Sequence, residues 1–96
     1  MIDQVISLPD REFLPWFTSI EVGLTLRPGR VFRGYSIAIA DENDRTFASS
    51  AHYDLPENGS TTITVPISPP RGKNQVVIVK VLNNWNRTVK SERGRV

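Results

Sequence analysis

Residues 75–89 read QVVIVKVLNNWNRTV, and they contain a strand, a turn and the start of a second strand. The first part, residues 75–82, is apolar on both faces, which is typical of a strand in the middle of a sheet. The asparagine-rich segment 83–86 favours a turn, because asparagine side chains hydrogen-bond the local backbone. Residues 87–92 are polar and suit an edge strand. We therefore expect the two strands to pair as a hairpin.

The rest of the chain shows the same alternation of apolar and polar residues, and no stretch beyond residues 8–17 has a helical stripe. Turn signals rich in proline, glycine and asparagine separate the alternating stretches. Pro28-Gly29 is one of them, and we expect it to join the strands on either side as a hairpin. The expected strands cover residues 2–8, 20–27, 31–40, 45–53, 61–67, 75–82 and 87–92. This spacing predicts an all-β, antiparallel β-sandwich of about seven strands, with a small five-stranded barrel as the alternative.

The chain has 96 residues, which is enough for one domain with one hydrophobic core. Residues 1–17 are expected to form the first strand and an aromatic connector, in which Trp16 and Phe17 close one end of the core. Residues 91–96 are expected to be a flexible tail. We find neither a signal peptide nor a membrane-spanning segment in the sequence, and we expect no membrane insertion. The compartment is left open.

Composition weighs against an enzyme. The chain has no cysteine and one histidine, His52, and it has no glycine-rich phosphate loop. The acidic corner Asp41–Asp44 is the best metal candidate, but its spacing is not that of a calcium loop and a solvated turn explains the same residues. The segment His52–Asp54 has no partner for a catalytic triad. We therefore expect no catalytic residues, no metal and no cofactor.

Basic residues gather in the second part of the sequence. Residues 58–96 contain one acidic residue, Glu92, and seven basic ones. Nucleic-acid binding would need six of them on one face, with Trp85 stacking on a base: Arg71, Lys73, Arg87, Lys90, Arg93 and Arg95. A charged edge strand that resists pairing explains the same pattern, so we do not expect nucleic acid to be the partner.

The run from Gln75 to Val89 resembles the last two strands of immunoglobulin-like and fibronectin type III-like modules. Residues 60–70 are similar to the strand before them and the loop that follows it. The resemblance covers about a third of the chain. It implies a sandwich of immunoglobulin-like architecture and nothing about function, because this fold carries many unrelated functions. The chain departs from the immunoglobulin pattern in lacking the cysteine pair and a tryptophan within the alternating strands.

We therefore expect a non-catalytic accessory or recognition module. It would bind another protein or a neighbouring domain through an edge strand and the turn around Trp85, because exposed aromatic residues anchor interfaces. The expected binding residues are Trp85, Asn84, Asn86, Tyr53, Arg87 and Lys90. The alternatives are a carbohydrate-binding module that uses exposed aromatic residues and a nucleic-acid binder that uses the basic C-terminal face. A homodimer through edge strands also stays open.

Overall fold

The computed structural model describes residues 2–9, 14–26, 32–55 and 59–96, and these residues form strands and turns without a helix. The strands are β1 (Ile2–Pro9), β2 (Trp16–Leu26), β3 (Phe32–Asp41), β4 (Thr46–Ser49), β5 (Tyr53–Leu55), β6 (Gly59–Gly72), β7 (Val76–Leu82) and β8 (Thr88–Arg95). The predicted all-β class is confirmed.

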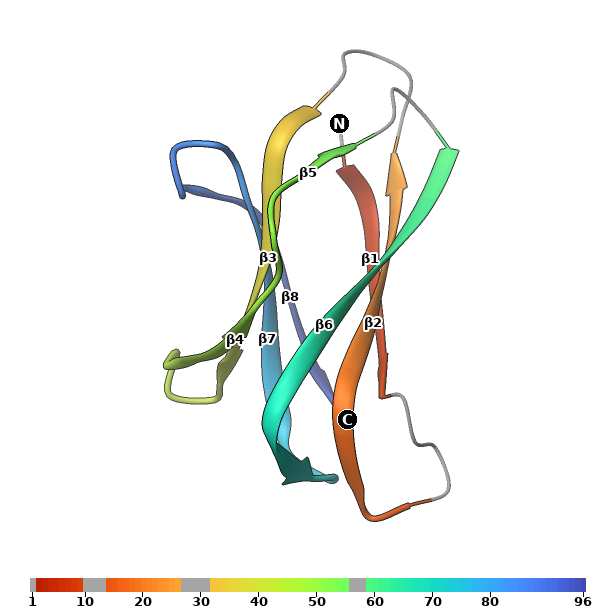
Figure 1. The fold of residues 1–96 in the computed structure, drawn as a ribbon, viewed down its shortest axis with the longest axis vertical. Helices are drawn as coiled ribbons and strands as arrows, with labels where there is room; N and C mark the ends of the chain where they lie inside the picture. The colour runs from red at the N-terminus through yellow and green to blue at the C-terminus, as the bar shows by residue number, and fades with distance from the viewer. Residues whose placement is uncertain (1, 10–13, 27–31, 56–58) are drawn as a thin grey trace.

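Two antiparallel sheets face each other (Figure 1). The first has three strands in the order β1-β2-β6. The second, the five-stranded sheet, has the order β4-β3-β7-β8, and β5 also pairs with β3. Because β4 and β5 follow one another along the same edge of β3, the eight strands occupy seven positions, as the sequence predicted.

The core lies between the sheets and is filled by alternate residues of the long strands, as period-2 patterning predicts. In the three-stranded sheet these residues are Ile20, Val22, Leu24, Leu26, Ile63, Val65 and Ile67. In the five-stranded sheet they are Ile37, Ile39, Val77, Val79 and Val81. The expected central strand is confirmed, since β7 lies between β3 and β8, and β8 is the polar edge strand.

The hairpin expected around Pro28-Gly29 is wrong. The strands on either side, β2 and β3, lie in different sheets, and β2 has β1 on one side and β6 on the other. Each strand has one apolar face, and placing them in opposite sheets turns those faces toward each other. A turn dipeptide marks where the chain bends and does not say which sheet the next strand joins. Residues 27–31 themselves lie outside the described ranges.

The two ends of the chain also differ from expectation. Strand β2 already begins at Trp16, so the connector is shorter than expected. Phe17 is fully buried in the core, but Trp16 is 43% exposed and does not close it. Residues 91–95, expected to be a flexible tail, lie in β8. The last residue, Val96, exchanges backbone hydrogen bonds with Gln75, which ties the end of the chain to the start of β7.

Candidate functional site

The turn between β7 and β8, residues 83–87, holds an exposed tryptophan on a hydrogen-bonded frame. The side-chain oxygen of Asn83 accepts from the backbone N–H of Trp85 at 2.9 Å and from that of Arg87 at 3.0 Å. The backbone of Asn83 bonds to Arg87 and to Asn86, and Asn86 takes a left-handed conformation with φ of 58°. We call residues 83–87 the Trp85 turn. Trp85 is 76% exposed, more than any other large hydrophobic residue in the described ranges.

The turn between β3 and β4, residues 41–45, is built in the same way. The side-chain oxygen of Asp41 accepts from the backbone N–H of Asn43 at 2.9 Å and from that of Arg45 at 3.0 Å. Its backbone bonds to Arg45 and Asp44, and Asp44 has a φ of 64°. We call residues 41–45 the Asp41 turn. Each bond has a counterpart in the Trp85 turn at the matching position.

The similarity extends to the whole hairpins. Residues 36–49 read SIAIADENDRTFAS and residues 78–91 read IVKVLNNWNRTVKS, so a shift of 42 positions carries Asp41 to Asn83 and Ser49 to Ser91. The register repeats as well: Ala38 pairs with Ser49 as Lys80 pairs with Ser91, and both ladders have a register shift beside the turn. Ala38 also pairs with Lys80 in the antiparallel ladder between β3 and β7. The two hairpins are therefore related by a local two-fold axis through the sheet.

Sequence reasoning missed this repeat, although a signal was present. Both copies contain an Asp or Asn, then two residues, a second Asp or Asn, and Arg-Thr, followed three residues later by serine. That spacing indicates that Asp41 and Asn83 organise their turns. Asp and Asn side chains accept hydrogen bonds from the backbone N–H two residues further along the chain.

The two turns differ in the side chains that take no part in these hydrogen bonds. Asn43 stands where the other turn has Trp85. Asp44 forms an ion pair with Lys80 at 2.5 Å, which ties the Asp41 turn to the middle of β7. The matching positions in the second copy hold Asn86 and Ala38, which have no charge. Among the described residues, no equivalent ion pair ties the Trp85 turn to a strand.

Tyr53 lies at the same end of the five-stranded sheet as the Trp85 turn. It pairs with Tyr35 of β3 and is 42% exposed. The start of β3 lies against the turn, because a Cβ on Gly34 would be 3.1 Å from the Cβ of Asn84. Gly34 has a φ of 69°, and its N–H donates to the Asp54 carboxylate at 3.0 Å. Two of the expected aromatic residues are thus brought to one end of one sheet.

The other expected binding residues follow the same hairpin. Asn84, Asn86 and Arg87 are exposed within the Trp85 turn. Lys90 lies further along β8, opposite the core residue Val81, and is half-buried at the sheet edge. Of the six expected residues, four belong to the turn, while Tyr53 and Lys90 lie on the strands beside it.

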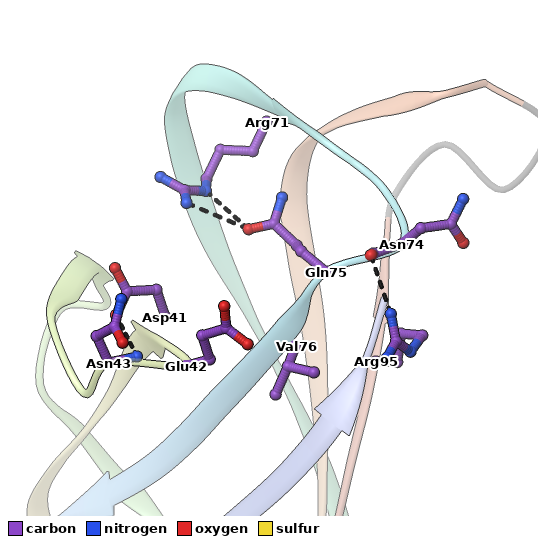
Figure 2. Close-up of a pocket in the computed structure, with 8 residues that line it drawn as sticks. All are labelled: Asp41, Glu42, Asn43, Arg71, Asn74, Gln75, Val76 and Arg95. Carbon is purple, nitrogen blue, oxygen red and sulfur yellow. Dashed lines mark hydrogen bonds between the residues drawn. The ribbon is translucent and has the colours of Figure 1, made fainter.

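A polar pocket of about 450 Å³ lies at the opposite end of the sandwich (Figure 2). It is lined by Asp41, Glu42, Asn43, Arg71, Asn74, Gln75, Val76 and Arg95. Arg71 is fixed there: its Nε and Nη2 donate to Gln75 Oε1 at 3.2 Å, and its guanidinium lies 4.0 Å from the Phe47 ring centre. Arg95 donates to the backbone oxygen of Asn74 at 3.1 Å. The pocket carries charges of both signs and thus has no strong preference for a cation or an anion.

The basic residues of the second part of the chain are spread along the molecule. Arg71 and Arg95 line the pocket, whereas Arg87 lies in the turn at the other end of β8. The seven steps from Thr88 to Arg95 span about 24 Å at the usual rise per residue. These side chains do not converge on one point.

Two observations concern the acidic corner and the surroundings of His52. Within the described ranges, no three His, Cys, Asp or Glu side chains are close enough together to hold a metal ion. Ser50, the serine closest to His52 in sequence, has a hydroxyl that accepts from the backbone of Ile37 and donates to Ala51. Nor does any described segment form an apolar helix long enough to cross a membrane.

Comparison with known protein families, with curated proteins and with solved structures finds no significant match to this chain.

Proposed function

We propose that this chain is a non-catalytic recognition module of immunoglobulin-like architecture that binds another protein through the Trp85 turn. The strand order supports the architecture. Lettered along the chain, with β4 and β5 together taken as C′, the sheets are A-B-E and C′-C-F-G. An immunoglobulin-like sandwich in which the strand after C joins the C-F-G sheet would have this strand order, which supports the proposal.

The observation that carries the proposed function is the exposure of Trp85 on an ordered turn. An indole buries roughly 150–250 Å² when covered, and truncation of a tryptophan at an interface hot spot typically costs about 2–4 kcal/mol of binding free energy. The Asn83 side chain fixes the backbone on both sides of Trp85, so little backbone freedom is lost on binding. Tryptophan is also among the residues most enriched at interface hot spots.

The Asp41 turn provides an internal control for a test. A photo-crosslinking amino acid is placed at position 85 in one variant and at position 43 in a second, and both are expressed in cells that naturally make the protein. We expect position 85 to give a discrete adduct with one partner and position 43 to give none. Adducts that are absent at 85, or that are the same at both positions, would reject the proposal.

A glycan is the second candidate partner, because Tyr53 and Trp85 lie at the same end of the sheet and aromatic rings stack on sugars. Trp16 does not join them, since it pairs with Gly72 at the other end of the sandwich. Titration of soluble oligosaccharides with tryptophan fluorescence as the readout tests this candidate. The Trp85→Phe variant separates the signal of Trp85 from that of Trp16.

A further inference from the structure

The five-stranded sheet has a second face, which points away from the core, and its residues are small or aliphatic. On β3 the outward positions alternate with the core residues Ile37 and Ile39. They hold Ser36, Ala38 and Ala40, which are all buried. On β7 the outward aliphatic residues are Val76, Ile78 and Leu82, which are half-buried. We call this surface the outer face.

The charges on the outer face are basic. Lys80 pairs with Ala38, so its side chain stands on the outward side. On β8, Arg93 pairs with Ile78 and Arg95 with Val76, so both side chains leave the strand on that same side. The Arg95 guanidinium also donates to the backbone oxygen of Asn74 at the edge of the polar pocket. Both arginines are exposed.

Two of the nearby carboxylates belong to the other side of the sheet, whereas Glu42 lines the polar pocket beside Val76 and Arg95. Glu92 pairs with the core residue Val79, and Asp41 pairs with Val77. Among the described residues, Asp44 is the acidic residue that reaches Lys80, and it neutralises that one charge. The outer face therefore has three basic groups, those of Lys80, Arg93 and Arg95, against the carboxylates of Asp44 and Glu42, and its net charge is positive beside an aliphatic strip.

The Asp41 turn and the Trp85 turn lie at opposite ends of the outer face. In Figure 1 the tips of the β3–β4 and β7–β8 hairpins both project away from the β1-β2-β6 sheet, at opposite ends of the five-stranded sheet. Trp85 is thus at one end of the outer face and the Asp44–Lys80 pair is toward the other.

We infer that the outer face extends the docking surface of the Trp85 turn and binds an acidic, extended segment of a protein partner. This inference rests on the proposed function and adds the chemistry of the partner. Apolar side chains of the segment would cover Ile78 and Leu82, its carboxylates would lie beside Arg93 and Arg95, and Trp85 would contact one end. Complementary charge sets the orientation and the association rate of such a contact.

A protein segment fits this face better than a nucleic acid. Phosphate contacts would use the two arginines but would leave the half-buried aliphatic strip of β7 without a partner. A peptide with alternating acidic and apolar residues satisfies both, because its side chains point to opposite sides every second residue.

The test uses ¹⁵N-labelled protein and three probes followed by amide chemical shifts. The probes are a peptide of four Glu-Leu repeats, which matches the length of β8, the corresponding Lys-Leu peptide and an oligothymidylate. We expect the Glu-Leu peptide to shift the amides of β7, β8 and the Trp85 turn. We also expect the double variant Arg93→Glu/Arg95→Glu to weaken its binding about tenfold or more. Arg45→Glu, an exposed change on the Asp41 turn, is the matched control and should leave binding unchanged.

The outcomes separate this inference from the proposed function. Equal binding of both peptides, no effect of the double variant, or tighter binding of the oligothymidylate would overturn the inference. If the crosslink from position 85 is still obtained in any of these cases, the Trp85 turn keeps its proposed function and the acidic partner is rejected. If that crosslink fails as well, both are rejected.

Discussion

The Asp41 turn and the Trp85 turn are two copies of one device with different side chains. Both close with the same backbone bonds, and an Asp or Asn oxygen accepts two N–H groups in each. One copy carries Asn43 and is tied to β7 through Asp44 and Lys80. The other carries Trp85, and in the described part of the chain no ion pair ties it to a strand. The comparison shows that turn stability does not require a tryptophan, so the exposed indole needs a separate explanation.

The largest expected effect comes from removing that indole. Trp85→Ala should weaken binding of the partner by about 100-fold, which corresponds to the 2–4 kcal/mol of a typical hot spot. Because the side chain is 76% exposed, the free energy of unfolding should change by less than about 0.5 kcal/mol. Asn43→Ala should change neither quantity. Calorimetric titration and urea unfolding measure the two effects, and a large loss of stability in Trp85→Ala would mean that the indole is structural.

Asn83 and Asp41, which organise the two turns, should contribute equally to the stability of the protein. Asn83→Ala and Asp41→Ala each remove an acceptor of two backbone N–H groups, and we expect each to lower the free energy of unfolding by about 1 kcal/mol. Only Asn83→Ala should also weaken partner binding, because it loosens the backbone around Trp85. Two stability losses that differ by several-fold would show that the turns are not equivalent.

A substitution beside the Trp85 turn tests how closely β3 supports it. Gly34→Ala places a methyl group 3.1 Å from the Asn84 Cβ on a residue with φ of 69°. We expect a loss of stability of about 1 kcal/mol, since both the conformation and the space disfavour a side chain. Amide shifts should move in residues 83–87. Unchanged stability and unchanged shifts there would argue against the close approach of the two segments.

The smallest effect on stability is expected from removing the ion pair between Asp44 and Lys80. Asp44→Asn removes the ion pair with Lys80 and gives the Asp41 turn the same residue that the other turn has at position 86. The Asp44 side chain is 63% exposed, so the loss should not exceed about 0.5 kcal/mol. High salt should reduce the difference between the variant and the natural protein. A difference that persists in high salt would mean that Asp44 acts through something other than charge.

Much of the fold could be predicted from the sequence because alternation is a local property. The apolar positions of residues 20–26, 63–67 and 77–81 each indicate a strand and its buried face without knowledge of the partner strand. Sheet membership is not local. The segment after Leu26 carries a turn signal that fits a hairpin and a crossing between sheets equally well, and only the complete sandwich decides between them.

The candidate site was predictable in part. The exposure of Trp85 follows from its place among asparagines, outside the alternating pattern. The equivalence of residues 41–45 and 83–87 was visible as a spacing of Asp, Asn, Arg and Thr. The sequence alone does not show that the two turns have the same structure, which becomes evident from their matching hydrogen bonds. The outer face could not be predicted, because the register of β8 against β7 decides on which side Arg93 and Arg95 stand.

The measurement that tests the central claim most directly is ¹⁵N relaxation of the two turns in the free protein. The proposed function requires the backbone around Trp85 to be ordered before any partner binds. It predicts backbone order parameters of about 0.8 or higher, equal within error, at Asn43 and Trp85. An order parameter below about 0.6 at Trp85, with Asn43 still rigid, would contradict it. The shared hydrogen-bond pattern would then not hold the tryptophan in place.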